Sequence, residues 1–307
     1  MSSNFSPLEL ADTGLKRHLT VIKGVFIQQW RIRKAYMAGL VVFIFVPLIL
    51  VTIPIIVMRA IVTDPDIIAQ NFFGGAEGSL NIFIILGVNL WMLILMLLWD
   101  FGTYLREEQY IGTLESILMS PATRYSILIG RALFSIVINV AVILVSSIIA
   151  IVIFESSMLF TIEFLHLLAV FFVVILGCIP MMGLSYFIGA LVLKFKEVFS
   201  LINMLQWALG LIMGIYAPWT TLPWVLKTMS ILFPATWSLT DARAIIAGSP
   251  PMLSLLSLEL GLETLGLPLF WGQIIVLIFG LFWCIVGYLI FSKIETRIKK
   301  NEGLSQY

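Results

Sequence analysis

Long apolar runs separated by shorter polar segments dominate the sequence. An α-helix rises ~1.5 Å per residue and the hydrocarbon core of a bilayer is ~30 Å thick, so about 20 apolar residues are needed to cross it. None of the runs that meet this length has a charged residue near its middle, where one would cost ~2.5 to 3.5 kcal/mol. The pattern therefore predicts an all-α integral membrane protein with six transmembrane helices within residues 36–291. The predicted spans are Tyr36–Met58, Leu80–Trp99, Ala132–Phe154, Leu165–Leu193, Val198–Ala217 and Phe270–Phe291.

The cytoplasmic amino-terminal segment, residues 1–35, shows a different period. Leu15, Leu19, Ile22, Phe26 and Trp30 recur at spacings of three or four, and the basic residues lie largely outside that stripe. This spacing predicts an amphipathic helix in the membrane interface. Anchoring to anionic lipid and contact with a partner both remain open as its role.

The basic residues indicate the orientation of the spans. Only Arg59, Lys227 and Arg243 lie on one side, and all the others lie on the opposite side. Because cytoplasmic segments are enriched in Lys and Arg, we expect both termini, including the tail 292–307, to be cytoplasmic. The first thirty residues lack the apolar core of a secretory signal, and the expected location is the plasma (cell inner) membrane. The residues assigned to the cytoplasm are Lys16, Arg17, Lys23, Arg31, Arg33, Lys34, Arg106, Arg124, Arg131, Lys194, Lys196, Lys293, Arg297, Lys299 and Lys300.

The composition agrees with this picture and narrows the chemistry. Hydrophobic residues make up 61% of the chain and charged residues 11%, and the net charge of +1 gives no basic excess for nucleic acid. There is no GxxxxGK[ST] phosphate-binding loop and no HExxH motif. His18 and His166 are isolated, and Cys178 and Cys284 lie in apolar runs. We expect no catalytic residue, no metal ligand and no cofactor in this chain.

The connection over residues 100–126 is longer than the ~2 to 8 residues that join adjacent helices. We expect two short helical pieces here, broken near Gly112 and ended by Pro121. Mixed charge beside an apolar edge is typical of a protein docking surface, although a solvated hairpin is the alternative. The charged residues are Asp100, Arg106, Glu107, Glu108, Glu115 and Arg124, and the apolar edge is Leu114, Ile117 and Leu118.

The connection over residues 218–269 contains an apolar stretch, 222–233, that is too short to cross a membrane. We expect it to dip into the outer leaflet or lie along it, with an aromatic belt beside it. Asp241 and Arg243 read as exposed charges, whose pairing with a neighbour would add under ~1 kcal/mol. The belt residues are Trp219, Trp224, Trp237 and Trp271.

Motifs in both connections resemble a known family. Arg106-Glu107, Gly112-Thr113-Leu114-Glu115, Ser120-Pro121 and Gly130-Arg131 are similar to the RE…GTLE…LL…P…GR pattern of the type-2 ABC exporter permeases. Leu222-Pro223-Trp224, Phe233-Pro234 and Asp241-Ala242-Arg243 resemble that family's extracytoplasmic re-entrant segment between spans five and six. The resemblance covers most of the chain.

The resemblance implies a permease subunit that forms a dimer, expected to be a homodimer, with two copies of a separate ABC ATPase subunit. ATP and Mg²⁺ would bind to that partner, which agrees with the missing phosphate-binding loop. The cytoplasmic coupling helix that contacts the ATPase would then comprise Arg106, Glu107, Glu108, Gly112, Thr113, Leu114, Glu115 and Pro121.

Polar residues within the spans are candidates for the substrate pathway. The resemblance implies that the second and fifth spans line it, which favours Asn89, Asn203 and Gln206 over Asn139; ordinary hydrogen bonding between helices is the alternative. Gly210 and Gly214 form a GxxxG pattern, which we assign to the dimer interface.

An uncharged pathway suits a hydrophobic drug, a lipid-like molecule or a glycan better than a small ion. Two alternatives from other classes remain: an ion-coupled secondary transporter, and a membrane scaffold that transports nothing. Each predicts a different result for the purified chain, because only the exporter requires an ATPase partner.

Overall fold

The computed structural model describes residues 15–61, 80–112, 124–154, 163–194, 198–247, 250–261 and 268–301. These residues contain helices and no strand. Five helices are long and apolar enough to cross a membrane, which confirms an all-α architecture suited to a multi-pass membrane protein. They are α2 (Met37–Ile61), α4 (Leu80–Ile111), α6 (Arg124–Phe154), α7 (Phe164–Lys194) and α12 (Pro268–Asn301).

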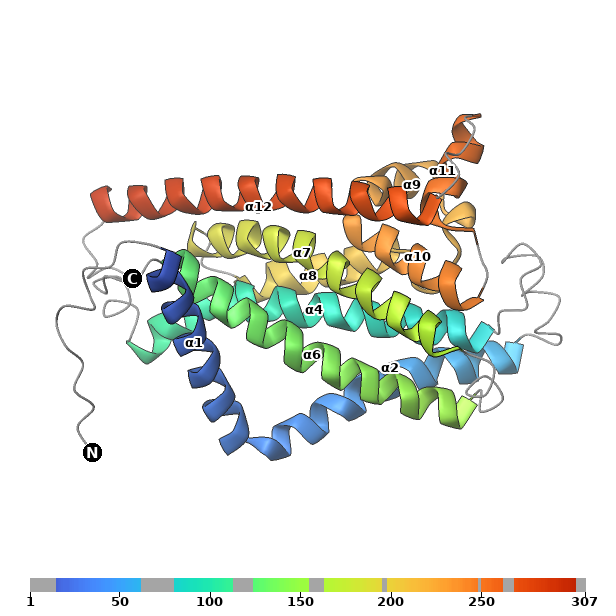
Figure 1. Ribbon diagram of the computed structural model, residues 1–307, viewed down its shortest axis with the longest axis horizontal. Coiled ribbons are helices and arrows are strands. Elements are labelled where there is room, and N and C mark those ends of the chain that lie inside the picture. Colours follow the sequence, from blue (N-terminus) through green and yellow to red (C-terminus); the bar gives the residue numbers. More distant parts are fainter. Residues whose placement is uncertain are drawn as a thin grey trace.

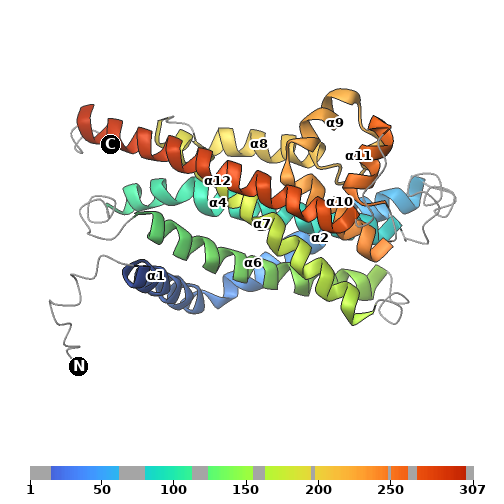
Figure 2. The ribbon, with the colours of Figure 1, turned by 45° about the horizontal axis from the view of Figure 1, so that its top comes forward.

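The fifth predicted span, 198–217, corresponds to a shorter helix. Helix α8 (Val198–Ile212) has 15 residues, so it falls below the length of a full span. It ends because Gly214 adopts a left-handed backbone with φ of +66°, a conformation that glycine adopts without steric cost. Gly210 and Gly214 therefore do not lie on one continuous helix, although α8 runs beside α4 within the bundle (Figure 2).

Helix α4 is the central element, and it is the most buried of the five candidate spans. It packs against α2 and α6 on one side and α8 on another, and it also contacts α7. Figure 2 shows α4 between α8 and α6. Polar groups on α4 are thus placed where other helices can meet them.

Helices α7 and α12 form the most extensive helix pair. A Cβ atom on Gly287 would lie 2.6 Å from the carbonyl oxygen of Gly183, and a Cβ on Gly183 would overlap the backbone of Cys284. Glycines at these positions allow the two backbones to approach closely, as small residues commonly do between apolar helices.

Helix α1 (Leu15–Ala35) forms as predicted and lies across one end of the bundle (Figure 1). That end also holds the carboxyl-terminal end of α12, and we call it the α1 end. The amphipathic stripe is divided: Phe26 packs edge-to-face on Phe134 of α6 with ring centroids 5.6 Å apart, whereas Leu19 is exposed. His18 Nδ1 and Ser126 Oγ are hydrogen-bonded at 2.7 Å. The helix is therefore docked on α6 in addition to any contact with lipid.

The opposite end of the bundle, the α10 end, contains the short elements of the second long connection. They are a 3-10 turn, η3 (Trp219–Thr221), and helices α9 (Trp224–Ile231), α10 (Pro234–Ala247) and α11 (Met252–Leu260). Helix α10 packs against α7, α12 and α4, so it is part of the bundle (Figure 1).

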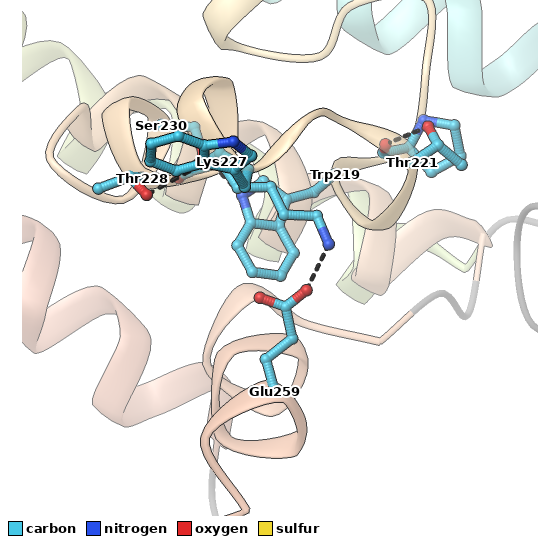
Figure 3. A network of polar contacts seen from close by, with 8 residues as sticks. Trp219, Thr221, Lys227, Thr228, Ser230 and Glu259 are labelled. Atoms are coloured by element: carbon cyan, nitrogen blue, oxygen red, sulfur yellow. Dashed lines mark hydrogen bonds and ion pairs between the residues drawn. The ribbon is translucent and has the colours of Figure 1, made fainter.

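The prediction of an aromatic belt at this end is wrong for two of its four tryptophans. Trp219 and Trp237 are buried with Met252 and Val276 in a small second core, while Trp224 and Trp271 are exposed. Figure 3 shows Trp219 beside Lys227 and Ser230, and its indole nitrogen donates to Ser230 Oγ at 2.6 Å. The buried pair holds η3 and α9 onto the bundle.

Candidate functional site

Other helices form hydrogen bonds with side chains of α4 at three levels along the length of that helix. At the level nearest the α10 end, Asn89 is only 2% exposed. Its side-chain amide donates to the carbonyl oxygen of Ile85 at 2.9 Å, and its oxygen accepts from Ser146 Oγ of α6 at 2.8 Å. In this conformation Asn89 faces α6, and its contacts are those of an interhelical hydrogen bond.

At the second level α4 meets α8 through Gln206. The indole nitrogens of Trp91 and Trp99 donate to the main-chain and side-chain oxygens of Gln206, at 3.1 and 3.2 Å. Gln206 in turn donates to Asn203 Oδ1 at 3.1 Å, and Asn203 is exposed. Two of the three predicted pathway residues, Asn203 and Gln206, are thus brought together, and Asn89 lies apart from them on the α6 side of α4.

At the third level, near the α1 end, the side chains of Asp100, Ser135 and Asn139 form a cluster between α4 and α6. Ser135 donates to Asp100 Oδ2, and Asn139 donates to the same oxygen at 3.3 Å and to Ser135 Oγ at 2.9 Å. The sequence reading placed Asp100 in a connecting loop and gave Asn139 no partner. The sequence gives no signal for this cluster, because Asp100 lies 35 residues from Ser135 and 39 residues from Asn139.

The predicted coupling segment begins as a continuation of α4. Residues 100–111 are helical, so Arg106, Glu107 and Glu108 lie on the same helix as the buried polar groups, and no separate first piece exists. The break near Gly112 is confirmed, since Gly112 has φ of +77°. Thr113, Leu114, Glu115 and Pro121 lie outside the described residues.

Arg243 of α10 joins three segments of the chain at the α10 end. It is 4% exposed, and its guanidinium donates to the carbonyl oxygens of Gly214 at 2.9 Å, Ile215 at 2.7 Å and Phe83 at 3.1 Å. The guanidinium carbon also lies 3.3 Å from the centroid of the Phe83 ring, a cation–π contact. The prediction of an exposed charge is wrong here, because Arg243 fixes the turn after α8 to the start of α4.

Asp241 makes a second set of contacts from the same helix. It is fully buried and accepts from the backbone N–H of Met252 at 3.0 Å and from Gln273 Nε2 at 2.6 Å. Burial raises the pKa of Asp241 to about 7, against smaller lowering effects of these two hydrogen bonds. Asp241 therefore ties α10 to α11 and α12, and it does not pair with Arg243.

The polar contacts described above join helices to one another. Among the residues that the structure describes, no group of three His, Cys, Asp or Glu side chains could hold a metal ion. The sequence matches no protein-family model, and no curated protein matches it.

Proposed function

We propose that this chain is the permease subunit of an ATP-driven exporter of the type-2 ABC class, which moves a hydrophobic drug, a lipid-like molecule or a glycan. It would act as a dimer with two copies of a separate ATPase subunit, in the plasma membrane, with the α1 end in the cytoplasm. The short α8 would be the fifth of six crossings. The shared position of α1 and the end of α12 supports an even number of crossings (Figure 1).

The observation that carries this proposal is the continuity of α4. One helix of 32 residues contains Asn89 and Asp100 within the bundle and extends through Arg106–Glu108 to the break at Gly112. A partner that moved the far end of this helix would move the contacts with α6 and α8 together, because a helix transmits displacement as a rigid element. The next residues, 113–121, are those that resemble the coupling helix.

The polar groups on α8 support a pathway on that side of α4. Asn203 is exposed and Gln206 half-buried, whereas Asn89 is enclosed between α4 and α6. A second permease chain facing α8 would meet Asn203, together with the exposed Trp207. This arrangement favours Asn203 and Gln206 over Asn89 as groups that meet cargo.

The direct test is to purify the full chain in mild detergent from its native membrane and identify stoichiometric partners by mass spectrometry. Recovery of an ATPase with a phosphate-binding loop supports the exporter. Recovery of another protein with no ATPase would support a scaffold, and recovery of the chain alone, under conditions that preserve other ABC complexes, would contradict the proposal.

A substitution at Gly112 tests the coupling role. A Cβ at Gly112 would meet nothing within 4 Å, so Gly112→Ala introduces no steric clash. Its cost is the ~1 to 2 kcal/mol that a residue with a Cβ atom pays for adopting a positive φ. We expect about fivefold less transport per ATP hydrolysed in the reconstituted complex. Gly24→Ala is the matched control, because Gly24 also has open space around it but lies within α1. Equal coupling in both variants would contradict the assignment.

The cluster at Asp100 favours a second candidate, an ion-coupled transporter. Asp100 is the last residue of a candidate span and meets Ser135 and Asn139, so a carboxylate stands at the membrane boundary. Intramembrane carboxylates commonly carry protons or cations in such transporters. Transport by the purified chain in liposomes, driven by an ion gradient and abolished in Asp100→Asn, would favour this candidate over the exporter.

A further inference from the structure

A cavity with a volume of about 270 Å³ lies at the α1 end, between α1, α4 and α6. Its charged side chains are Arg33 of α1, Arg131 of α6 and Asp100 of α4. It lies on the α6 side of α4, and α8 lies on another side (Figure 2), so it is separate from Asn203 and Gln206. Nothing in the proposed export path uses it.

The position of Asp100 in α4 would place the cavity where a bilayer changes from hydrocarbon to headgroups. Asp100 is the last residue of the apolar segment 80–100, whose length of 21 residues matches the ~30 Å thickness of a hydrocarbon core. Charged side chains at this depth can reach phosphate and amine groups of lipid without entering the apolar layer.

Aromatic rings accompany both guanidinium groups. The Arg131 guanidinium lies 4.1 Å from the centroid of the Tyr104 ring, and that of Arg33 lies 5.3 Å from the centroid of the Phe43 ring. Such contacts restrict a guanidinium while leaving its N–H groups directed around the ring edge. Both arginines are half-buried, so part of each remains reachable from the cavity.

Asp100 provides a negative group in the same cavity. Ser135 and Asn139 both donate to its Oδ2 atom, and no hydrogen bond among the described residues involves Oδ1. The carboxylate is half-buried and lines the cavity with Ser135. A ligand would therefore meet two positive groups and one negative group.

The wall formed by α1 is held firmly in place. A Cβ on Gly130 of α6 would lie 2.8 Å from the carbonyl oxygen of Ile22, so the two backbones are in close contact. The hydrogen bond between His18 and Ser126 and the packing of Phe26 on Phe134 fix the same interface. These contacts hold the part of α1 that precedes the cavity-lining residues against α6.

The last turn of α1 and the residue that follows it give the cavity an apolar border. Ile32 and Tyr36 line it, and both are exposed, Tyr36 to 71%. A volume of 270 Å³ is below the ~300 to 1,000 Å³ of pockets that enclose a drug-sized molecule, so it suits the headgroup of a larger ligand. The remainder of that ligand would lie along the exposed apolar face.

We propose that this cavity binds the headgroup of a membrane phospholipid that carries both a phosphate and a primary amine, as phosphatidylethanolamine does. Arg33 and Arg131 donate to the phosphate oxygens, since guanidinium groups match phosphate geometry. Asp100 accepts from the ammonium group, and Gln29 adds a polar contact on the α1 wall. The bound lipid would join α1 to α4 and α6. This inference requires a chain in a membrane and does not depend on the ATPase partner.

The test uses the delipidated full chain in detergent, with phosphatidylethanolamine, phosphatidylcholine and phosphatidylglycerol of identical acyl chains added separately. Native mass spectrometry counts the bound lipid. We expect phosphatidylethanolamine to bind at least fivefold more tightly than the other two, because a quaternary ammonium has no N–H to donate and a glycerol headgroup has no positive charge. Equal binding of the three lipids would overturn the proposal.

Variants locate the binding. Arg33→Gln and Arg131→Gln should each weaken phosphatidylethanolamine binding about tenfold, the effect of losing a hydrogen bond to a charged group. Arg31→Gln is the matched control, because Arg31 is on the same helix but does not line the cavity. Loss of binding in all three variants to the same extent would mean a nonspecific charge effect and would overturn the assignment to this cavity.

A charge change at Asp100 tests the amine contact separately. Asp100→Asn keeps an oxygen that can accept from Ser135 and Asn139, so the fold should survive, which circular dichroism and gel filtration can verify. We expect this variant to lose the preference for phosphatidylethanolamine over phosphatidylglycerol while still binding phosphatidylglycerol. An unchanged preference would remove Asp100 from the site. Tight binding of soluble glycerophosphoethanolamine would show a site for a free metabolite and would overturn the lipid assignment.

Discussion

The two ends of the bundle use a carboxylate and a guanidinium in different ways. At the α10 end, Asp241 and Arg243 are almost completely buried and hydrogen-bonded to protein groups. Arg243 donates to backbone carbonyls, and Asp241 accepts from a backbone N–H and from Gln273. At the α1 end, Asp100 and Arg131 are half-buried and line a cavity. Charged groups thus join helices at both ends, and at the α1 end they also border a cavity.

This difference indicates how to separate structural from ligand-binding charges in an apolar protein. A buried polar side chain that hydrogen-bonds groups of the same chain holds those groups in place, and removing it leaves them unsatisfied. A half-buried charge beside a cavity should contribute less to the fold, because solvent or a ligand can reach part of it. Each of the following substitutions tests one side of this distinction.

The largest expected effect is at Arg243. Arg243→Met would leave the carbonyl oxygens of Gly214, Ile215 and Phe83 without their charged donor in a buried site, so we expect a loss of about 3 to 5 kcal/mol. The apparent melting temperature of the purified chain in detergent would measure it. Arg131→Met at the α1 end should reduce the stability much less. Equal losses of stability in the two variants would contradict the distinction between the two ends.

Gly87→Ala provides an independent check on Arg243 that keeps the arginine. A Cβ on Gly87 would overlap the Arg243 guanidinium and lie 2.5 Å from the carbonyl oxygen of Ile215. Displacing this packing should cost about 1 to 3 kcal/mol. A melting temperature like that of the unaltered chain would mean that the Arg243 contacts contribute little.

The next effect is a pH dependence from Asp241. Its pKa is about 7 in the folded chain and near the ordinary value of 3.8 when unfolded. Between these values the folded chain holds a proton that the unfolded chain lacks, so this group's stabilisation is complete below about pH 4, declines as pH rises to about 7, and is flat above. The slope is at most about 1.4 kcal/mol per pH unit. Melting temperatures from pH 4 to pH 8 would measure it.

Asp241→Asn supplies the control for that dependence. The amide can accept from Met252 and can donate to Gln273 Oε1, which is buried and has no hydrogen-bond partner among the described residues. We expect this variant to lose the pH dependence that belongs to residue 241 and to remain folded. The same slope in the variant and the unaltered chain would assign the dependence to groups other than Asp241.

The smallest effect is expected at an exposed ion pair. Lys227 and Glu259 join α9 to α11 near the surface, where solvent screens the charges (Figure 3). Glu259→Gln should change the stability by under ~1 kcal/mol and become indistinguishable from the unaltered chain at high salt. A loss as large as that of Arg243→Met would show that exposure does not separate the two kinds of charge.

The sequence predicts the apolar helices well because each follows from local composition. The amphipathic α1, the spans around α2, α4, α6, α7 and α12, and the break at Gly112 are all found near their expected positions. The end of α8 was missed because Gly214 reads equally as a helix-packing glycine and as a turn, and only the backbone conformation separates the two.

The contacts of the charged residues could not be predicted in the same way. Arg243 meets carbonyl groups that are 28, 29 and 160 residues away, and backbone groups leave no signature in a sequence. The cavity at Asp100 likewise depends on how closely α1 approaches α6. The sequence locates the charged residues, but only tertiary packing decides which of them are enclosed and which border a cavity.

The docking of α1 on α6 has a consequence for synthesis of the chain. His18 and Ser126 are 108 residues apart, so at ~5 to 20 residues per second α1 emerges about 5 to 20 s before its partner surface exists. During that interval the bilayer surface can shelter Ile22 and Phe26, which later face α6. The amphipathic sequence of α1 thus lets the helix lie on the membrane surface first and pack against α6 in the finished protein.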